Sequence, residues 1–283
     1  MTAQKRQPAE ASPVERLLVS IDGLRKRHNS KTAHFFRTSL RRFQAWEEII
    51  HPKLDSDKKD AVKFLNKLRK TTGKLRDSKV HLDLLDNLDE GSGKEKNKVE
   101  KALKLRRRAA RKKLDSLLNE ADLKRHLNHL RLMGEPPLAN HQASENPLPA
   151  ADQLALDEYR SFVESRAPLS PDNLHSYRLA CKGFRYTAEL AGDTPQARAL
   201  IDAWKSVQDL SGDWHDYHTL SKLTQEICGD CTLHSLLVGM RDKKYDESVA
   251  AVERAERQLL ARPEAEKKRP ASARRNHRRS SVA

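Results

Sequence analysis

The residues best suited to chemistry in this sequence are a histidine and two cations at helical spacing. His34 is followed by Arg37 and Arg41, at positions +3 and +7. At about 100° per residue these three side chains share one helix face, while Leu40 and Phe43 fall on the opposite, apolar face. An imidazole beside two guanidinium groups predicts either a solvated surface or a site for an anion.

The arrangement recurs 141 residues later, where His175, Arg178 and Lys182 occupy the corresponding positions. The apolar stripe recurs with it, because Tyr177 and Cys181 stand where the first copy has Phe36 and Leu40. Arg42 and Arg185 add a further cation to each copy. A polar motif that repeats in phase with its apolar stripe favours the anion site over the solvated surface.

A second motif follows each copy. Gly73 precedes Asp77 by four residues, and Gly212 precedes Asp216 by four residues. Residues at this spacing lie on one helix face, so each glycine predicts a close approach of two helices beside a placed aspartate. We interpret both aspartates as structural residues that orient the arginines, and the whole as an internal repeat.

The densest basic run lies in residues 101–113, which hold eight Lys and Arg residues and no acid. Leu103 and Leu114 belong to an apolar stripe along the same segment, so the run is predicted to be an amphipathic helix rather than a basic tail. Two interpretations stay open for its cations: a flanking wall of the anion site, or a solvated face. The candidates for the wall are Lys101, Lys104, Arg108 and Arg111.

The elements that must position these residues are all helices, since no alternating strand pattern occurs. Ser12-Pro13 and Ser170-Pro171 each predict a helix start, with serine as N-cap and proline as the first residue. Helices are predicted over about 13–28, 31–51, 60–88, 94–132, 152–166, 172–191, 196–227 and 233–260. The expected fold is all-α, with two four-helix halves at 13–133 and 152–262, a linker at 134–151, and disordered arms at 1–12 and 263–283.

Composition narrows the function. Lys and Arg exceed Asp and Glu by 15, which favours a polyanionic partner, while aromatic residues at 5% disfavour a base-stacking surface. The N-terminus lacks a secretory signal pattern, and no apolar run is long enough to span a membrane. Three cysteines then predict a reducing, cytoplasmic location. Cys228 and Cys231 have no second ligand pair at zinc-like spacing, so no metal or other cofactor is predicted.

The histidine-led helix, the later Gly-x3-Asp helix, the Arg-rich fourth helix and their duplication together resemble the CHAD family (conserved histidine α-helical domain) over residues 14–262. The resemblance implies two four-helix halves related by a pseudo-two-fold axis, with a basic central channel. It also implies non-catalytic binding of inorganic polyphosphate and association with polyphosphate granules. The chain departs from the family pattern at Gln44 and Gly183, where relatives often carry cations.

The predicted function is therefore polyphosphate binding without catalysis. Arg and Lys side chains from both repeats would form many charge-assisted contacts to phosphate oxygens. A nucleic-acid-binding protein is the alternative, supported by the net charge and the basic C-terminal arm. A polyphosphate hydrolase is disfavoured, because no carboxylate cluster suited to Mg²⁺ accompanies the motif. The predicted binding residues are His34, Arg37, Arg41, Arg42, His175, Arg178, Lys182 and Arg185, flanked by Lys101, Lys104, Arg108 and Arg111.

Overall fold

The computed structural model describes residues 12–50, 56–88, 93–119, 123–133 and 150–261. Within these ranges every regular element is a helix, which confirms the all-α prediction. Most of the predicted linker and arms lies outside the described residues. The helices are α1 (Pro13–Lys26), α2 (Ser30–Ile50), α3 (Ser56–Asp86), α4 (Gly93–Leu118), α5 (Leu123–Met133), α6 (Ala151–Ser165), α7 (Leu174–Glu189), α8 (Pro195–Cys228) and α9 (Thr232–Leu260).

One of the two predicted serine-proline helix starts is correct. Ser12 caps α1, and it forms a reciprocal capping box with Glu15, in which each side chain binds the other residue's backbone N–H. Ser170 does not start a helix. Its carbonyl closes a turn by accepting from the backbone N–H of Asn173, and α7 begins at Leu174. The proline at residue 171 therefore belongs to a turn, a position that suits its fixed φ equally well.

The predicted fourth helix, 94–132, is wrong as a single element. It is two helices, because α4 ends at Leu118 and α5 begins at Leu123. Asn119 lies in the turn after α4, and asparagine favours such positions because its side chain competes for backbone hydrogen bonds. The break lets Leu123 and Leu130 turn back into the core, where both are buried.

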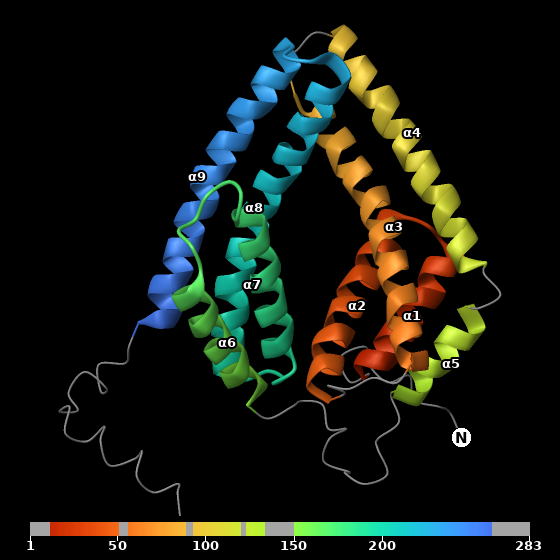
Figure 1. Cartoon of the computed structure of the whole chain (residues 1–283), viewed down its shortest axis with the longest axis vertical. Coiled ribbons are helices and arrows are strands. Elements are labelled where there is room, and N and C mark those ends of the chain that lie inside the picture. Colours follow the sequence, from red (N-terminus) through yellow and green to blue (C-terminus); the bar gives the residue numbers. More distant parts are fainter. Residues whose placement is uncertain (1–11, 51–55, 89–92, 120–122, 134–149, 262–283) are drawn as a thin grey trace, which may run out of the picture.

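The helices form two groups that meet at one end of the molecule and diverge toward the other (Figure 1). The first group comprises α1–α5, and the second comprises α6–α9. Long helices α3, α4, α8 and α9 converge at the narrow end, while α2 and α7 pack against each other nearer the wide end. The two repeat copies thus lie on neighbouring helices from different groups.

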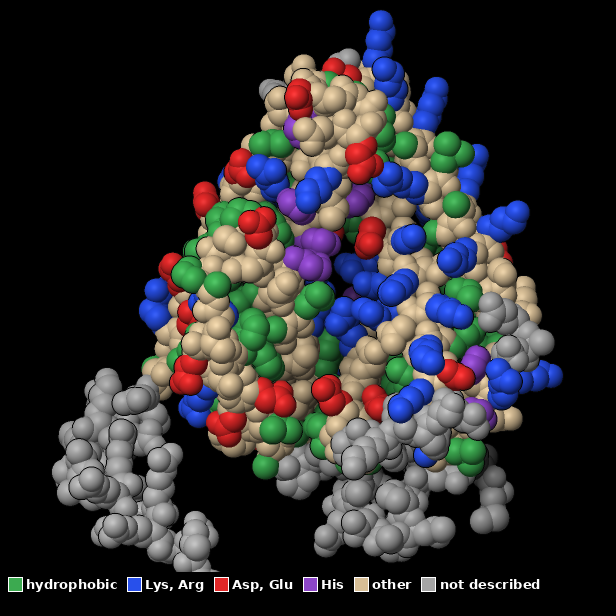
Figure 2. Space-filling view, viewed as in Figure 1, with side chains coloured by type: hydrophobic (Ala, Val, Ile, Leu, Met, Phe, Trp, Pro, Cys, Tyr) green, Lys and Arg blue, Asp and Glu red, His purple; other side chains and the backbone are tan. Residues whose placement is uncertain are grey.

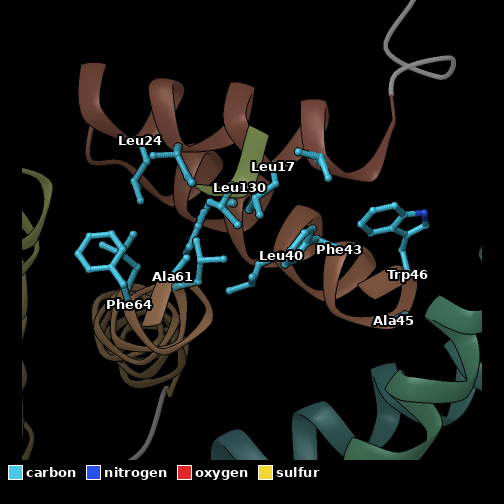
Figure 3. Close-up of a cluster of buried hydrophobic side chains, with 14 of the residues drawn as sticks. Leu17, Leu24, Leu40, Phe43, Ala45, Trp46, Ala61, Phe64 and Leu130 are labelled. Carbon is cyan, nitrogen blue, oxygen red and sulfur yellow. The ribbon is translucent and has the colours of Figure 1, made fainter. Parts of the chain in front are cut away.

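Each group has its own apolar core. In the first group Leu17 of α1, Leu40 and Phe43 of α2, and Leu130 of α5 are fully buried (Figure 3). In the second group Trp204 of α8 packs among aromatic side chains of α6 and α7. The predicted apolar stripes are therefore confirmed: Phe36, Leu40 and Phe43 are fully buried in α2, and Tyr177 and Cys181 are buried in α7.

Two apolar joints hold the groups together. At the narrow end, Leu82 and Leu103 of the first group share a cluster with Leu220 and Leu233 of the second. At the other end, buried residues of 186–197 extend the core of the first group. Burial of apolar surface is worth about 25 cal/mol per Å², so these joints resist separation of the groups.

A carboxylate adds a polar link between α2 and α7. Glu189 accepts from Nε of Arg42 at 2.5 Å and lies 3.4 Å from Nε of Arg185. The Glu189 side chain is only 15% exposed. Removing a shielded carboxylate leaves its two guanidinium groups uncompensated, and this costs more than removing one partner of an exposed ion pair.

Replacing Glu189 by Gln should therefore destabilise the protein. The change leaves two arginines beside a neutral group, so we expect the free energy of unfolding to fall by about 1–3 kcal/mol. Urea unfolding followed by circular dichroism measures this. Glu253→Gln is the matched control, because Glu253 pairs with Arg257 on the exposed surface of α9 and its loss should cost less than about 0.5 kcal/mol. Equal effects of the two variants would contradict the assigned link.

Candidate functional site

The two repeat helices line one cavity of about 290 Å³, here called the motif cavity. Figure 2 shows a hollow between the two groups, with Lys and Arg side chains on its walls and His side chains at its rim. Helices α2, α3, α7 and α8 all contribute to the motif cavity. Its lining residues are His34, Arg37, Thr38, Arg41, Arg76, Arg178, Lys182, Arg185, Tyr186, Lys205, Gln208 and Asp209.

The charge of the motif cavity is strongly one-sided. Five arginines and two lysines line it, against one carboxylate, that of Asp209. Six of the eight cations and histidines predicted from the two repeats are among its residues; Arg42 and His175 are not. The prediction that both repeats face one groove agrees with this geometry, whereas a continuous central channel stays a prediction.

Gly73 makes room for an arginine rather than for a helix backbone. A Cβ atom at this position would lie 2.6 Å from Nη1 of Arg37. The same Nη1 donates to the backbone carbonyl of Arg69 at 2.9 Å, one helical turn before the glycine. The glycine therefore lets the guanidinium lie flat against α3, with its remaining N–H groups available to the cavity.

The second repeat uses the same arrangement. A Cβ atom at Gly212 would lie 3.0 Å from Nη2 of Arg178, and Nε of Arg178 donates to the carbonyl of Gln208 at 3.4 Å. Gln208 in turn donates to the carbonyl of Cys181 on α7, which ties the two helices together. The close helix approach predicted from the Gly-x3-Asp spacing is therefore wrong in its physical reason, because at both glycines an arginine side chain takes the space.

Lys182 carries the strongest electrostatic strain in the motif cavity. Burial lowers its pKa to about 6, and the neighbouring guanidinium groups of Arg178, Arg41 and Arg37 lower it further in the same direction. Among the described residues no carboxylate pairs with its ammonium group. An anion in the cavity would favour the charged form of this lysine.

The two motif aspartates lie beside the arginines without forming a hydrogen-bonded pair with them in the described chain. Burial raises the pKa of Asp216 to about 6, with Arg178 opposing that shift. Burial also raises the pKa of Asp77 against the opposing charge of Arg37, although its carboxylate still meets solvent. The negative charges of Asp77 and Asp216 offset only part of the positive charge of the neighbouring arginines.

The two motif histidines occupy different environments. His34 lies at the solvent-accessible wall of the motif cavity, and partial desolvation of its ring, together with the charges of Arg76 and Arg37, lowers its pKa. The ring of His175 instead stacks on that of His215, with centroids 4.3 Å apart, and its buried Nδ1 has no partner. The repeat in sequence therefore does not give two equivalent histidines in space.

Positions 42, 44 and 183 all fall outside the motif cavity. Arg42 is engaged with Glu189, and the side-chain amide of Gln44 donates to Asn66 of α3 at 3.3 Å. Gly183 is exposed, with open space where a Cβ would stand. The departures from the family pattern at residues 44 and 183 therefore do not remove a cation from this cavity.

The cations of α4 lie apart from the motif cavity. Lys104, Arg108 and Arg111 line a different cavity, and Lys101 is exposed. None of these four residues lines the motif cavity. The α4 cations therefore do not form a wall of the motif cavity, which was one of the two interpretations left open by the sequence.

Sequence reasoning missed two cations of the motif cavity, Arg76 of α3 and Lys205 of α8. A usable signal was present in the case of Arg76, which follows Gly73 by three residues and so lies on the face that holds Arg37. Lys205 lies three residues before Gln208 and shares its face in the same way.

The described part of the chain holds no group of three or more His, Cys, Asp or Glu residues arranged to bind a metal. Cys228 and Cys231 are thiols, with their Sγ atoms 2.9 Å apart at the turn between α8 and α9. No helix in the described ranges is long and apolar enough to cross a bilayer.

The fold and site define a class: an all-α protein in which two helical groups enclose a cationic cavity between duplicated His/Arg helices. The family model of the CHAD domain matches residues 12–225, and the chain belongs to this family. The match does not reach α9, so the predicted domain end at residue 262 stays a prediction.

Solved structures show the same fold. The structure of "PptA from Streptomyces chartreusis" matches with a TM-score of 0.60 and 17% identity, over 88% of this chain and 95% of that one. The CHAD domain from the plant Ricinus communis matches with a TM-score of 0.58 and 17% identity, over 89% of each chain. No curated protein sequence matches this chain.

The arginine-over-glycine contact predicts opposite effects for two alanine substitutions. Gly183→Ala should stabilise the protein by up to about 1 kcal/mol, because alanine is the better helix former and space is open there. Gly73→Ala should show no gain or a loss, since the Cβ displaces Arg37 from its hydrogen bond, which is worth about 1 kcal/mol.

Urea unfolding of both variants measures the difference. Gly212→Ala should fall between them, because its Cβ would stand 3.0 Å rather than 2.6 Å from the arginine. A gain at Gly73 equal to that at Gly183 would show that Arg37 moves without cost.

Proposed function

We propose that this protein binds inorganic polyphosphate through the motif cavity and catalyses no reaction on it. The observation that carries the proposal is the crowding of five arginines and two lysines from four helices around one cavity with a single lining carboxylate. Such a cluster is costly unless an anion occupies it, because like charges repel strongly where water is excluded. Membership of the CHAD family supports the same partner.

The chemistry of the cavity suits a phosphate chain. Polyphosphate offers about one negative charge per phosphate and no base edge, so it is recognised by charge and by oxygen geometry alone. Arg37 and Arg178 are held by backbone carbonyls, which leaves N–H groups available as forked donors. Fixed donors reduce the entropy that is lost on binding.

A catalytic role has less support. Phosphoryl transfer to water usually needs a metal to neutralise the developing charge and a base to position the water. In the described residues, Asp209 is the one carboxylate that lines the cavity. Release of orthophosphate from long-chain polyphosphate in the presence of Mg²⁺ would overturn this part of the proposal.

We further propose a cytoplasmic protein that associates with polyphosphate granules, with its net charge of +15 attracting it to their surface. A fluorescent fusion of the full chain, expressed in cells that accumulate polyphosphate, should colocalise with the granules. A diffuse signal in those cells would contradict the association.

Neutralising two cations of the motif cavity should weaken binding. The double variant Arg41→Gln, Arg178→Gln removes one guanidinium from each repeat, and we expect at least a tenfold loss of affinity for long-chain polyphosphate. It should also lower the slope of log K against log salt by about one to two. Fluorescence anisotropy with labelled polyphosphate at several salt concentrations measures both quantities.

The matched control is Arg254→Gln, Arg257→Gln, which makes the same charge change on the exposed face of α9. This variant should retain affinity within about twofold. Equal losses of polyphosphate affinity in both double variants would mean that the protein attracts polyphosphate by net charge alone and not through the motif cavity. Displacement of polyphosphate by duplex DNA at lower phosphate-equivalent concentration would favour the nucleic-acid alternative instead.

Binding should tighten as the pH falls from 8 to 6. Because burial and its arginine neighbours lower the pKa of Lys182 to about 6, its side chain is mainly neutral at pH 7.5 in the free protein. A bound polyanion stabilises the charged form, so binding takes up a proton. Protonation of Asp216, whose pKa is raised to about 6, acts in the same direction.

Calorimetry in two buffers with different ionisation enthalpies measures this proton uptake. Lys182→Arg, which keeps a fixed positive charge, should bind polyphosphate with up to one proton fewer taken up and a flatter pH profile. Lys205→Arg, a conservative change in the same cavity, is the control. Unchanged proton uptake in Lys182→Arg would exclude Lys182 as the coupled group.

A further inference from the structure

A second cationic cavity lies on a different face of α3 from the motif cavity. It encloses about 330 Å³ and is here called the α4 cavity. The two cavities share no lining residue: Leu75 of α3 lines the α4 cavity, whereas Arg76, the next residue, lines the motif cavity. The lining residues of the α4 cavity are His28, Leu75, Lys104, Arg107, Arg108 and Arg111.

Four cations of one helix face supply the positive charge. Lys104, Arg107, Arg108 and Arg111 fall within about 100° of one another around α4, which is why they reach the same cavity. Figure 2 shows Lys and Arg side chains along the edge of the molecule that α4 forms in Figure 1. Lys104 is paired with Glu100 at 2.8 Å.

The three arginines of the α4 cavity carry unbalanced charge. Within the described residues, Arg107, Arg108 and Arg111 have no ion pair with any carboxylate, although ion pairs are formed nearby by Arg106 and Lys104. Three neighbouring guanidinium groups without a counter-ion present many parallel N–H donors. Phosphoryl oxygens match this donor geometry better than single carboxylates do.

A histidine supplies a second, independent observation. His28 follows the end of α1 and lines the α4 cavity, and Nδ1 of its ring lies 2.9 Å from a carboxylate oxygen of Asp115. The opposite ring atom, Nε2, is buried and has no hydrogen-bond partner in the structure. The ring of His28 is thus fixed by Asp115 at the wall of the α4 cavity, where it will sense a ligand that binds the neighbouring arginines.

We propose that the α4 cavity is a second binding site for phosphoryl anions, separate from the motif cavity. Arg107, Arg108 and Arg111 bind the phosphoryl oxygens, and the His28 ring, held by Asp115, forms the wall beside them. The ligand is either a single phosphate ion or a short stretch of a phosphate chain, because both present the same oxygens. The site stands whether or not the motif cavity binds polyphosphate, since it uses none of the same residues.

NMR of the histidine ring nitrogens tests the site on the full chain. Orthophosphate, pyrophosphate and tripolyphosphate are titrated separately into protein labelled with ¹⁵N-histidine. We expect the Nε2 signal of His28 to shift with saturation. Saturation by orthophosphate identifies a single-ion site, and saturation by tripolyphosphate alone identifies a chain segment. A His28 signal that none of the three anions moves overturns the proposal.

A matched pair of double variants tests the same site by affinity. Arg108→Gln, Arg111→Gln should lower tripolyphosphate affinity at this site at least tenfold and abolish the His28 shift. Lys94→Gln, Lys98→Gln makes the same charge change at exposed positions earlier in α4 and should leave both unchanged. Equal behaviour of the two variants overturns the proposal, as does duplex DNA shifting His28 where all three phosphate anions fail.

The motif-cavity variant Arg41→Gln, Arg178→Gln separates the two proposals. It should retain the His28 shift, because neither arginine lines the α4 cavity. If this variant loses affinity for long-chain polyphosphate but keeps the His28 shift, the two cavities are independent sites. Loss of the His28 shift in this variant would merge the two cavities into one site and overturn the separate assignment.

Discussion

Repulsion among cations held close together in a half-buried cavity is the constraint on which this structure depends. Arg37, Arg41, Arg178 and Lys182 all have a lowered pKa, chiefly because burial removes water. Like-charged neighbours lower it further, while Asp77 and Asp216 oppose the shift at Arg37 and Arg178. Such a cluster opposes folding. It persists because apolar clusters at both ends of the interface hold the two groups together, and because Glu189 neutralises Arg42 and Arg185 between α2 and α7.

The arginine-over-glycine contact shows how the chain limits this cost. Each motif arginine donates to a backbone carbonyl of the next helix, so part of its guanidinium is satisfied by the protein before any ligand arrives. Glycine is needed because a Cβ atom would occupy the space of the guanidinium. The remaining donors are fixed in direction, which suits a ligand that is recognised by its oxygens alone. Lys182 has no such contact in the described part of the chain, and its pKa is lowered to about 6.

The two helical groups share some of these contacts and differ in others. The arginine and glycine contacts recur in both, whereas His34 faces the motif cavity and His175 stacks on His215. The proposed sites lie on different faces of α3, and a flexible polyanion that reaches both would bind more tightly through effective concentration than through either alone. A single phosphate ion would gain nothing from the pair, so ligand length decides whether the sites cooperate.

The sequence by itself determined the all-α fold, the apolar stripes and the cationic faces of α2 and α7. These features follow from helical periodicity, which is local, and from a repeat that places the same residue types in phase twice. The same local logic failed where two outcomes fit one pattern, as at the serine-proline pair of residues 170–171 and at the break after Leu118. Helical periodicity also predicted only a close approach of two helices at Gly73 and Gly212, and not the arginine side chains that lie there.

Only the tertiary structure decided which cationic faces meet. Arg42 and Arg41 are adjacent in sequence, yet one pairs with Glu189 and the other lines the motif cavity, because a step of about 100° points them at different helices. The cations of α4 were equally plausible as a wall of that cavity, but the packing of α4 places three of them at a separate cavity. Periodicity fixes the face of a helix on which a residue lies, but the packing of distant helices fixes what that face meets.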